Sequence, residues 1–340
     1  MLPSAVKPTA VLTLPEIFAL SAAALVGSGA TRENADPVAR SIQDAEAEGF
    51  PNGGLTYLLH YCEHLRSGRV DGRAVPIVRV AAPSVIQIDA AHGFCHSAFV
   101  TAEQQFVELT RQTGIASLGI TRSHSASALG WFVDRLSRQG LVSIGCSNSS
   151  PLVAPWGGKR RFFGTNPLAF GAPRTGRPPL VIDMATSQTA RLTVIELASS
   201  GRPIAPGLAL DTEGRPTTDP QRALDGTVAP LGGHKGTGLA LMVEILAAGL
   251  TEANWSHDVV PMALPNGPPP GVGQFFIALA PERLGVSSLA TRLDELLKDM
   301  LSEEGVRVPG DRRLAARARA EREGVSFDVE VIEKVKACAR

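Results

Sequence analysis

A glycine-rich segment in the second half of the chain carries the residues best suited to bind an anion. Gly232 and Gly233 precede His234 and Lys235, and an apolar stretch that reaches Leu250 follows. Glycine lets a backbone approach a ligand closely, and the first turn of a helix leaves N–H groups free to bind negative charge. The segment therefore indicates either an anion-binding turn or a glycine turn that only begins a buried helix.

Two polar turns are further candidates because each adjoins apolar residues. Thr165 to Pro167 follows a pair of phenylalanines, and Asp183 to Ser187 ends the β-branched run from Leu180 to Ile182. Ends of strands are common places for ligand-binding side chains in α/β proteins. The same hydroxyl and carboxyl groups could instead cap the turns themselves.

The histidines do not indicate a metal site. His60 and His64 lie four residues apart beside Glu63, which places them on one helical face, but no third ligand follows in a recognisable pattern. A partly buried helix face is the expected role of this pair. His124 precedes a predicted helix, where a histidine can contact phosphate, act as an acid or lie beside the helix cap.

Charge and composition exclude several classes of protein. Lysine plus arginine and aspartate plus glutamate both number 33, so no excess of positive charge indicates a nucleic-acid partner. The longest apolar stretch, from Leu239 to Leu250, contains Glu244 and is shorter than the roughly 20 residues that span a bilayer. No secretory leader is expected, because Pro8, Pro15 and the acid after it interrupt the first apolar run. We expect no membrane partner.

The spacing of the cysteines and of the glycines excludes further classes of protein. The four cysteines have no Cys-x-x-Cys spacing, which predicts reduced thiols in a cytoplasmic protein. The dinucleotide fingerprint Gly-x-Gly-x-x-Gly and the phosphate loop that ends in Gly-Lys-Ser or Gly-Lys-Thr are both missing from the sequence. An ordinary Rossmann or P-loop protein is therefore not supported.

Helices at both chain ends surround a mixed α/β region in the expected organisation. A capping box at Thr13 to Glu16 begins the first helix, and helical spacing continues over 33–48 and 55–67. Short β-branched runs alternate with helices between Ile77 and Ile182, and a buried strand is expected over 274–279. Residues 201–230, rich in Pro, Gly, Thr and Asp, predict a long surface excursion.

Taken together, the motifs resemble the type-2 malate/L-lactate dehydrogenase family of non-Rossmann nicotinamide oxidoreductases. The matching segments occur in the family's order over most of the chain: 67–72, 155–158, 163–170, 183–187, 217–220 and 232–236. Residues 308–313 look most like the branch of Δ1-piperideine-2-carboxylate and Δ1-pyrroline-2-carboxylate reductases. The resemblance implies an α/β, non-Rossmann fold with a largely antiparallel sheet in the cofactor domain, a helical domain from both chain ends, and a homodimer.

The resemblance also implies a domain division and a set of cofactor contacts. Residues 1–75 and 285–340 would form the helical, dimerisation and substrate-side region, and 76–284 the nicotinamide-cofactor-binding α/β domain. The implied cofactor contacts are His124, Ser125, Ala126, Ser127, Ala128, Thr165, Asp183, Met184, Ala185, His234, Lys235, Pro309, Gly310, Asp311, Arg312 and Arg313. Lys235 with Arg312 or Arg313 would suit a phosphate-bearing cofactor, which favours NADPH over NADH.

This chain departs from the family at the residues that handle protons. The family's Ser-His-Gly and following Arg correspond to Asn52, Gly53, Gly54 and Tyr57, so the relay His and the carboxylate-binding Arg are replaced. Thr193 stands where the imine branch has an Asp. Together with Thr165, the residues Asn52, Gly53, Tyr57 and Thr193 form the expected substrate side.

Ser125 stands where the family has the second His of a His-His pair. Tyr57 and His124 are the predicted catalytic residues, Tyr57 as a hydrogen-bond donor and His124 as a group that titrates near neutral pH. Gly53 is expected to leave a wider pocket. Alternatively, Tyr57 only packs in a helix interface and His124 only touches the cofactor.

The predicted function is NADPH-dependent reduction of a C=N bond in a small cyclic imine. A cyclic imine can be protonated by solvent before hydride arrives, so it tolerates the loss of an enzymic acid better than a carbonyl does. The alternatives are a 2-hydroxyacid dehydrogenase of the malate or lactate type, and a cofactor-binding protein that has lost or changed the family reaction.

Overall fold

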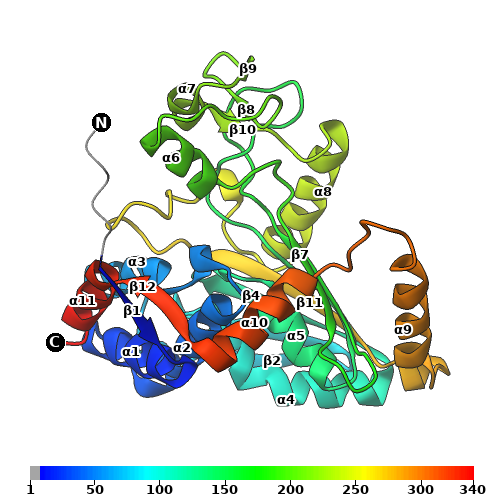
Figure 1. Ribbon diagram of the computed structural model, residues 1–340. Helices are drawn as coiled ribbons and strands as arrows, with labels where there is room; N and C mark the ends of the chain where they lie inside the picture. The colour runs from blue at the N-terminus through cyan, green and yellow to red at the C-terminus, as the bar shows by residue number, and fades with distance from the viewer. Residues whose placement is uncertain (1–7) are drawn as a thin grey trace.

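A seven-stranded sheet lies at the centre of the molecule (Figure 1). The computed structural model describes residues 8–340. The strand order is β2-β3-β4-β11-β5-β6-β7, and all neighbours are antiparallel except β3 and β4. The strands are β2 (Ile77–Ala82), β3 (Val85–Asp89), β4 (Ile115–Ser123), β5 (Val142–Ser147), β6 (Leu168–Ala172), β7 (Leu180–Met184) and β11 (Val272–Leu279). The expectation of a largely antiparallel α/β fold is confirmed.

One face of this sheet packs against α4 (Cys95–Thr113) and α5 (Gly130–Arg138). The centre of that core is a trio of fully buried rings, Phe99, Phe132 and Phe276, with centroids 5.1–5.3 Å apart. Phe276 comes from β11, the last strand of the sheet in sequence, which inserts between β4 and β5. The C-terminal third of the chain therefore completes a core that the earlier strands begin.

The helices from the two chain ends form a second core beside the sheet. It contains α1 (Leu14–Gly27), α2 (Arg32–Ala47), α3 (Leu55–Ser67) and α11 (Val329–Cys338), which bury Leu25, Ile42, Leu58 and Val335 among others. The expected capping box of α1 is confirmed, since Thr13 and Glu16 bond each other's backbone N–H groups. Strand β1 (Thr9–Leu12) pairs with β12 (Val325–Asp328), which brings the two ends of the described chain together.

The region expected as a surface excursion is instead a small folded lobe. It contains α6 (Arg191–Ser199), α7 (Pro220–Asp225) and a three-stranded sheet of order β10-β8-β9, and it stands apart from the main sheet in Figure 1. The short strands are β8 (Ala209–Leu210), β9 (Pro216–Thr217) and β10 (Thr227–Val228). Val153, Phe163 and Val194 are buried in its own core. Apolar residues between the prolines and glycines therefore fold this segment.

The second face of the main sheet is covered only in part. At one end it packs against α8 (His234–Glu244) and the π-helical turn η2 (Ile245–Gly249), and at the other against α9 (Leu289–Met300). Helix α9 lies within the range 285–340 that the sequence assigns to the helical region, yet Leu293 and Leu297 pack on the sheet. The domain boundaries at 75 and 285 stay predictions.

The remaining elements are short, except one helix. They are η1 (Pro51–Gly53), η3 (Ser256–Asp258), η4 (Pro281–Leu284) and the helix α10 (Asp311–Glu323), which contacts α2. Within residues 8–340 no helix combines the length and the apolarity that crossing a membrane requires.

Candidate active site

The start of α3 meets the loop at residues 124–128, and this contact brings predicted substrate and cofactor residues together. The Tyr57 hydroxyl lies 3.3 Å from Ser125 Oγ. Gly53 is buried, and a Cβ atom built on it would lie 2.7 Å from Ser127 Oγ and 3.0 Å from the Phe50 ring. The expectation of open space at Gly53 is therefore wrong, because the Ser127 hydroxyl and the Phe50 ring already fill it.

Tyr57 is placed to donate a hydrogen bond and not to accept a proton. Burial raises the pKa of Tyr57, and the bond to Ser125 offsets that shift in part. The phenol is therefore protonated at neutral pH. Its ring packs edge-on against Tyr61, with centroids 5.0 Å apart, so both packing and a hydroxyl contact hold the side chain.

His124 is a buried, neutral residue rather than a titrating group at the mouth of the site. Its side chain is 1% exposed and lies edge-on to Tyr61 and Phe94. Burial, followed by the nearby His64 and Arg69, lowers the pKa of His124 well below its ordinary value. The expectation that His124 titrates near neutral pH is wrong, because desolvation penalises the charged ring.

Two polar residues beside the site were missed by sequence reasoning. His64 Nδ1 lies 2.8 Å from His124 Nε2, whereas the spacing of the histidines predicted only a place for His64 on a helix face. Glu46 Oε1 accepts a hydrogen bond from the Leu55 N–H at 2.6 Å, and burial raises the pKa of Glu46 to about 7. No spacing of residues in the sequence predicts either contact, because each joins separate segments of the chain.

The predicted cofactor residues gather along residues 183–187, at and beyond the end of β7. At one end, Asp183 Oδ2 accepts from the Gly130 N–H at 2.7 Å, where α5 begins. The turn before α10 lies against the same strand, because a Cβ atom built on Gly310 would lie 3.3 Å from the Val181 carbonyl oxygen.

The other end of this stretch reaches the remaining predicted segments. Thr186 donates to the Thr165 carbonyl oxygen through both its N–H, at 2.9 Å, and its hydroxyl, at 3.0 Å. The Thr186 carbonyl oxygen accepts from the Leu231 N–H at 2.9 Å, just before the glycine turn that leads to His234. The structure thus joins predicted contacts from distant parts of the chain, at Thr165, Asp183 and Gly310, around one strand end.

Two of the three cations that the sequence offers to a phosphate remain free to bind one. Lys235 is exposed in the first turn of α8, and Arg312 is exposed in the first turn of α10; neither has a hydrogen bond or ion pair within residues 8–340. Arg313 differs, because its Nη1 lies 3.2 Å from Glu48 Oε2. Among the expected substrate residues, Asn52 and Thr193 are exposed.

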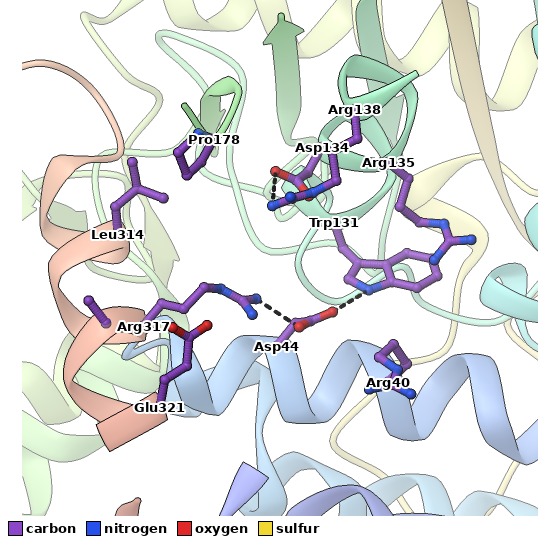
Figure 2. A pocket seen from close by; sticks show the side chains of 11 residues that line it. Arg40, Asp44, Trp131, Asp134, Arg135, Arg138, Pro178, Leu314, Arg317 and Glu321 are labelled. Atoms are coloured by element: carbon purple, nitrogen blue, oxygen red, sulfur yellow. Dashed lines mark hydrogen bonds and ion pairs between the residues drawn. The ribbon is translucent and has the colours of Figure 1, made fainter. Parts of the chain in front are cut away.

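A cavity of about 450 Å³ lies between α2, α5 and α10 (Figure 2). Asp44 stands at its floor, where it accepts from Trp131 Nε1 at 3.1 Å and pairs with Arg317 at 2.7 Å. Asp134 and Arg138 form a second ion pair on its wall. The cavity contains none of the predicted substrate residues, and its charges largely neutralise one another.

The chain is similar to known proteins over almost its whole length. Residues 12–336 match the family described as malate/L-lactate dehydrogenase. The chain is 41% identical to the (2R)-3-sulfolactate dehydrogenase (NADP(+)) of Chromohalobacter salexigens, over 96% of this chain and 98% of that protein. It is 36% identical to a Δ1-pyrroline-2-carboxylate/Δ1-piperideine-2-carboxylate reductase of Pseudomonas syringae pv. tomato, over 98% and 97%.

The likeness extends to three dimensions. The crystal structure of Δ1-piperideine-2-carboxylate reductase from Pseudomonas syringae matches with a TM-score of 0.92 at 36% identity, over 97% of this chain and 99% of that chain.

The filled space at Gly53 predicts the effect of adding one methyl group. Gly53→Ala should lower the free energy of unfolding by about 1–3 kcal/mol, because the new Cβ overlaps Ser127 Oγ. Gly53→Ala combined with Ser127→Gly should recover most of that loss. Urea denaturation of both variants measures the effect, and a Gly53→Ala protein as stable as the parent would contradict the packing described.

Because its carboxyl group is buried, Glu46 should stabilise the fold less as pH rises. Its folded-state pKa of about 7 exceeds the ordinary 4.5, so its stabilising contribution is full at low pH and is lost as pH rises through 7. Glu46→Gln should therefore gain stability relative to the parent as pH rises, by about 2 kcal/mol between about pH 5.5 and about pH 8. Glu63→Gln, an exposed acid on α3, is the control, and a pH-independent difference for Glu46→Gln would refute this assignment.

Proposed function

Because the chain belongs to the malate/L-lactate dehydrogenase family, we propose that it is an oxidoreductase that uses NADPH to reduce a C=N bond in a small cyclic imine. The Δ1-pyrroline-2-carboxylate/Δ1-piperideine-2-carboxylate reductase of Pseudomonas syringae, 36% identical and aligned over nearly the whole chain, supports the choice of reaction class.

The observation that carries this proposal is that none of the residues expected at the family's proton-handling positions is an acid that titrates near neutral pH. Gly53, Tyr57, Ser125 and Thr193 are all uncharged at neutral pH. Reduction of a carbonyl builds negative charge on oxygen, and loss of a positioned acid there costs about 10²–10⁴ in rate. A cyclic imine avoids that cost, since solvent can protonate its nitrogen before the reaction.

The residues of the site then have distinct tasks. The Tyr57 phenol donates a hydrogen bond to the substrate, and Ser125 Oγ fixes the direction of the phenol. Bound NADPH supplies the hydride. The rings of Tyr61 and Phe94 exclude water from the side of the Tyr57–Ser125 pair that faces His124. His124 holds the loop rather than exchanging protons.

The residues around the end of β7 fit a dinucleotide phosphate. Helix α8 begins without a side-chain cap, so N–H groups of its first turn remain available for phosphate. The first N–H of α5 is instead bonded to Asp183. Lys235 and Arg312 add two unpaired cations. Arg312 is the residue that we assign to the 2′-phosphate, because Arg313 is engaged with Glu48.

A 2-hydroxyacid dehydrogenase remains the alternative enzyme. The sulfolactate dehydrogenase of Chromohalobacter salexigens is the specific observation that favours it. A protein of this fold that binds NADPH but has lost or changed the family reaction is the alternative outside catalysis.

We also propose a homodimer in the cytoplasm. Helix α8 and η2 pack Val243 and Ala247 on the sheet, while Met242 and Ile245 are 57% and 49% exposed on the outer side. An apolar strip of this kind is typical of a surface that a second copy covers. The four buried free thiols suit a reducing compartment.

Steady-state assays test the reaction. The protein should reduce Δ1-pyrroline-2-carboxylate or Δ1-piperideine-2-carboxylate faster than pyruvate or oxaloacetate, and Tyr57→Phe should lower kcat/KM for the imine by about tenfold, the equivalent of one hydrogen bond. Faster oxidation of (2R)-3-sulfolactate with NADP+ would favour the alternative enzyme. NADPH binding with no turnover on any of these compounds would favour the cofactor-binding protein.

Cofactor preference is a separate prediction. Calorimetric titration should give about tenfold tighter binding of NADPH than of NADH, since one charge-assisted phosphate contact is worth about 1.4 kcal/mol or more. Arg312→Ala should remove most of this preference, whereas Lys235→Ala should weaken both cofactors alike. Equal affinities in the parent protein would contradict the assignment.

Sedimentation tests the homodimer. Met242→Glu with Ile245→Glu should shift the protein toward a monomer, because two buried charges would replace apolar contacts. Leu296→Glu is the control, since Leu296 is also exposed but lies on α9. A parent protein that sediments as a monomer at micromolar concentration would exclude the dimer.

A further inference from the structure

Two buried imidazoles connect the middle of α3 with the loop that carries Ser125. His64 Nδ1 and His124 Nε2 are 2.8 Å apart, and His64 Nε2 lies 2.9 Å from the Leu264 carbonyl oxygen. Both side chains are 1% exposed. The chain of contacts therefore runs from the loop before β11, through α3, to the residue next to Ser125.

The chemistry of a carbonyl oxygen fixes the protons in this chain. His64 Nε2 lies 2.9 Å from the Leu264 carbonyl oxygen, which only accepts hydrogen bonds, and 3.4 Å from Arg69 Nη1, which only donates them. The shorter contact assigns a proton to His64 Nε2 that points at Leu264. In a neutral ring, His64 Nδ1 is then a bare acceptor, and His124 Nε2 must donate to it. His124 Nδ1 is left unprotonated, and it has no partner among the described residues.

Arg69 holds the loop that contains Leu264. Its fully buried guanidinium donates to four carbonyl oxygens of one loop, those of Val260, Pro261, Leu264 and Pro268. These bonds hold the Leu264 carbonyl oxygen where His64 can reach it. A cation so close to His64 also opposes protonation of the ring.

We propose that His64 and Arg69 are positioning residues for the Tyr57–Ser125 pair, because they hold His124 in one tautomer and one orientation and thereby fix Ser125, which follows it. The inference rests on the proposed function in one respect, namely that Tyr57 and Ser125 face the substrate.

The same geometry makes the arrangement sensitive to acid. Protonation of His64 would place N–H groups on both sides of the 2.8 Å contact, so His124 must then change tautomer or turn away. The charged or titratable groups that act on the two rings are Arg69, His60 and Glu63 around His64, and His96 beside His124. Among them only Glu63 favours the protonated ring, so the contact persists at neutral pH.

Kinetics of matched variants test the positioning role. His64→Ala should lower kcat for the imine by about tenfold with a smaller effect on KM for NADPH, because Lys235 and Arg312, the cations that we assign to the cofactor, lie on other elements. His64→Gln should restore most of kcat, since its amide can donate to Leu264 and accept from His124. His64→Gln should also remove the decline of kcat that protonation of His64 causes as pH falls. Ser67→Ala is the control, because it deletes a 2.7 Å hydrogen bond to the Pro265 carbonyl oxygen without touching either ring.

A folded His64→Ala protein with parental kcat and an unchanged pH profile would overturn the proposal. Arg69→Lys should act in the same direction as His64→Ala, because an ammonium group cannot bond four separate carbonyl oxygens at once.

Magnetic resonance gives a readout that needs no substrate. Nitrogen-15 spectra of labelled histidine should show His64 and His124 both protonated on Nε2 and bare on Nδ1. The chain has only two tyrosines, so carbon-13 labelling of the phenol carbon reports Tyr57 and Tyr61 alone. His64→Ala should shift the Tyr57 signal, whereas Ser67→Ala should not.

These spectra separate the two possible failures. The expected tautomers and Tyr57 shift, found in a protein that reduces no imine, would reject the proposed function and keep the positioning role. The opposite tautomer, or a Tyr57 signal indifferent to His64→Ala, would reject the positioning role whatever the substrate.

Discussion

The contact between the start of α3 and the loop at residues 124–128 is the constraint on which the candidate site depends. It joins two separately packed cores, one built from helices of both chain ends and one built on the sheet. Gly53 and Ser127 meet there at a distance that leaves no room for a Cβ atom on Gly53, and Tyr57 reaches Ser125 one helical turn further on. Since protein interiors are close-packed, a change on either side of this contact must be matched on the other.

This coupling explains how a glycine at the contact leaves the candidate site well ordered. Gly53 does not create a void, because the Ser127 hydroxyl and the Phe50 ring occupy the volume beside it. Tyr57 and Ser125 meet through hydroxyl groups and need no counter-ion. Such a pair can orient a ligand by hydrogen bonds but cannot change its own charge near neutral pH.

Buried neutral groups recur around the site for the same physical reason. His124 and Glu46 are both removed from water, and in each case desolvation favours the uncharged form. For the histidine this lowers the pKa, and for the glutamate it raises it. The hydrogen bonds of His124 to His64 and of the Leu55 N–H to Glu46 join separate backbone segments.

The sequence by itself indicated a mixed α/β region and the polar turns at Thr165, Asp183 and Gly233, because those depend on local patterns: β-branched runs, the capping box at Thr13 and glycine turns. The largely antiparallel sheet was expected only from the resemblance to the family. The sequence could not determine the insertion of β11 between β4 and β5, the pairing of Arg313 with Glu48, or the His64 to His124 contact. Each of these joins residues that are far apart along the chain, and strand register and helix packing decide which side chains meet. The space beside Gly53 belongs to the same group, since a missing side chain in the sequence says nothing about which neighbour fills its volume.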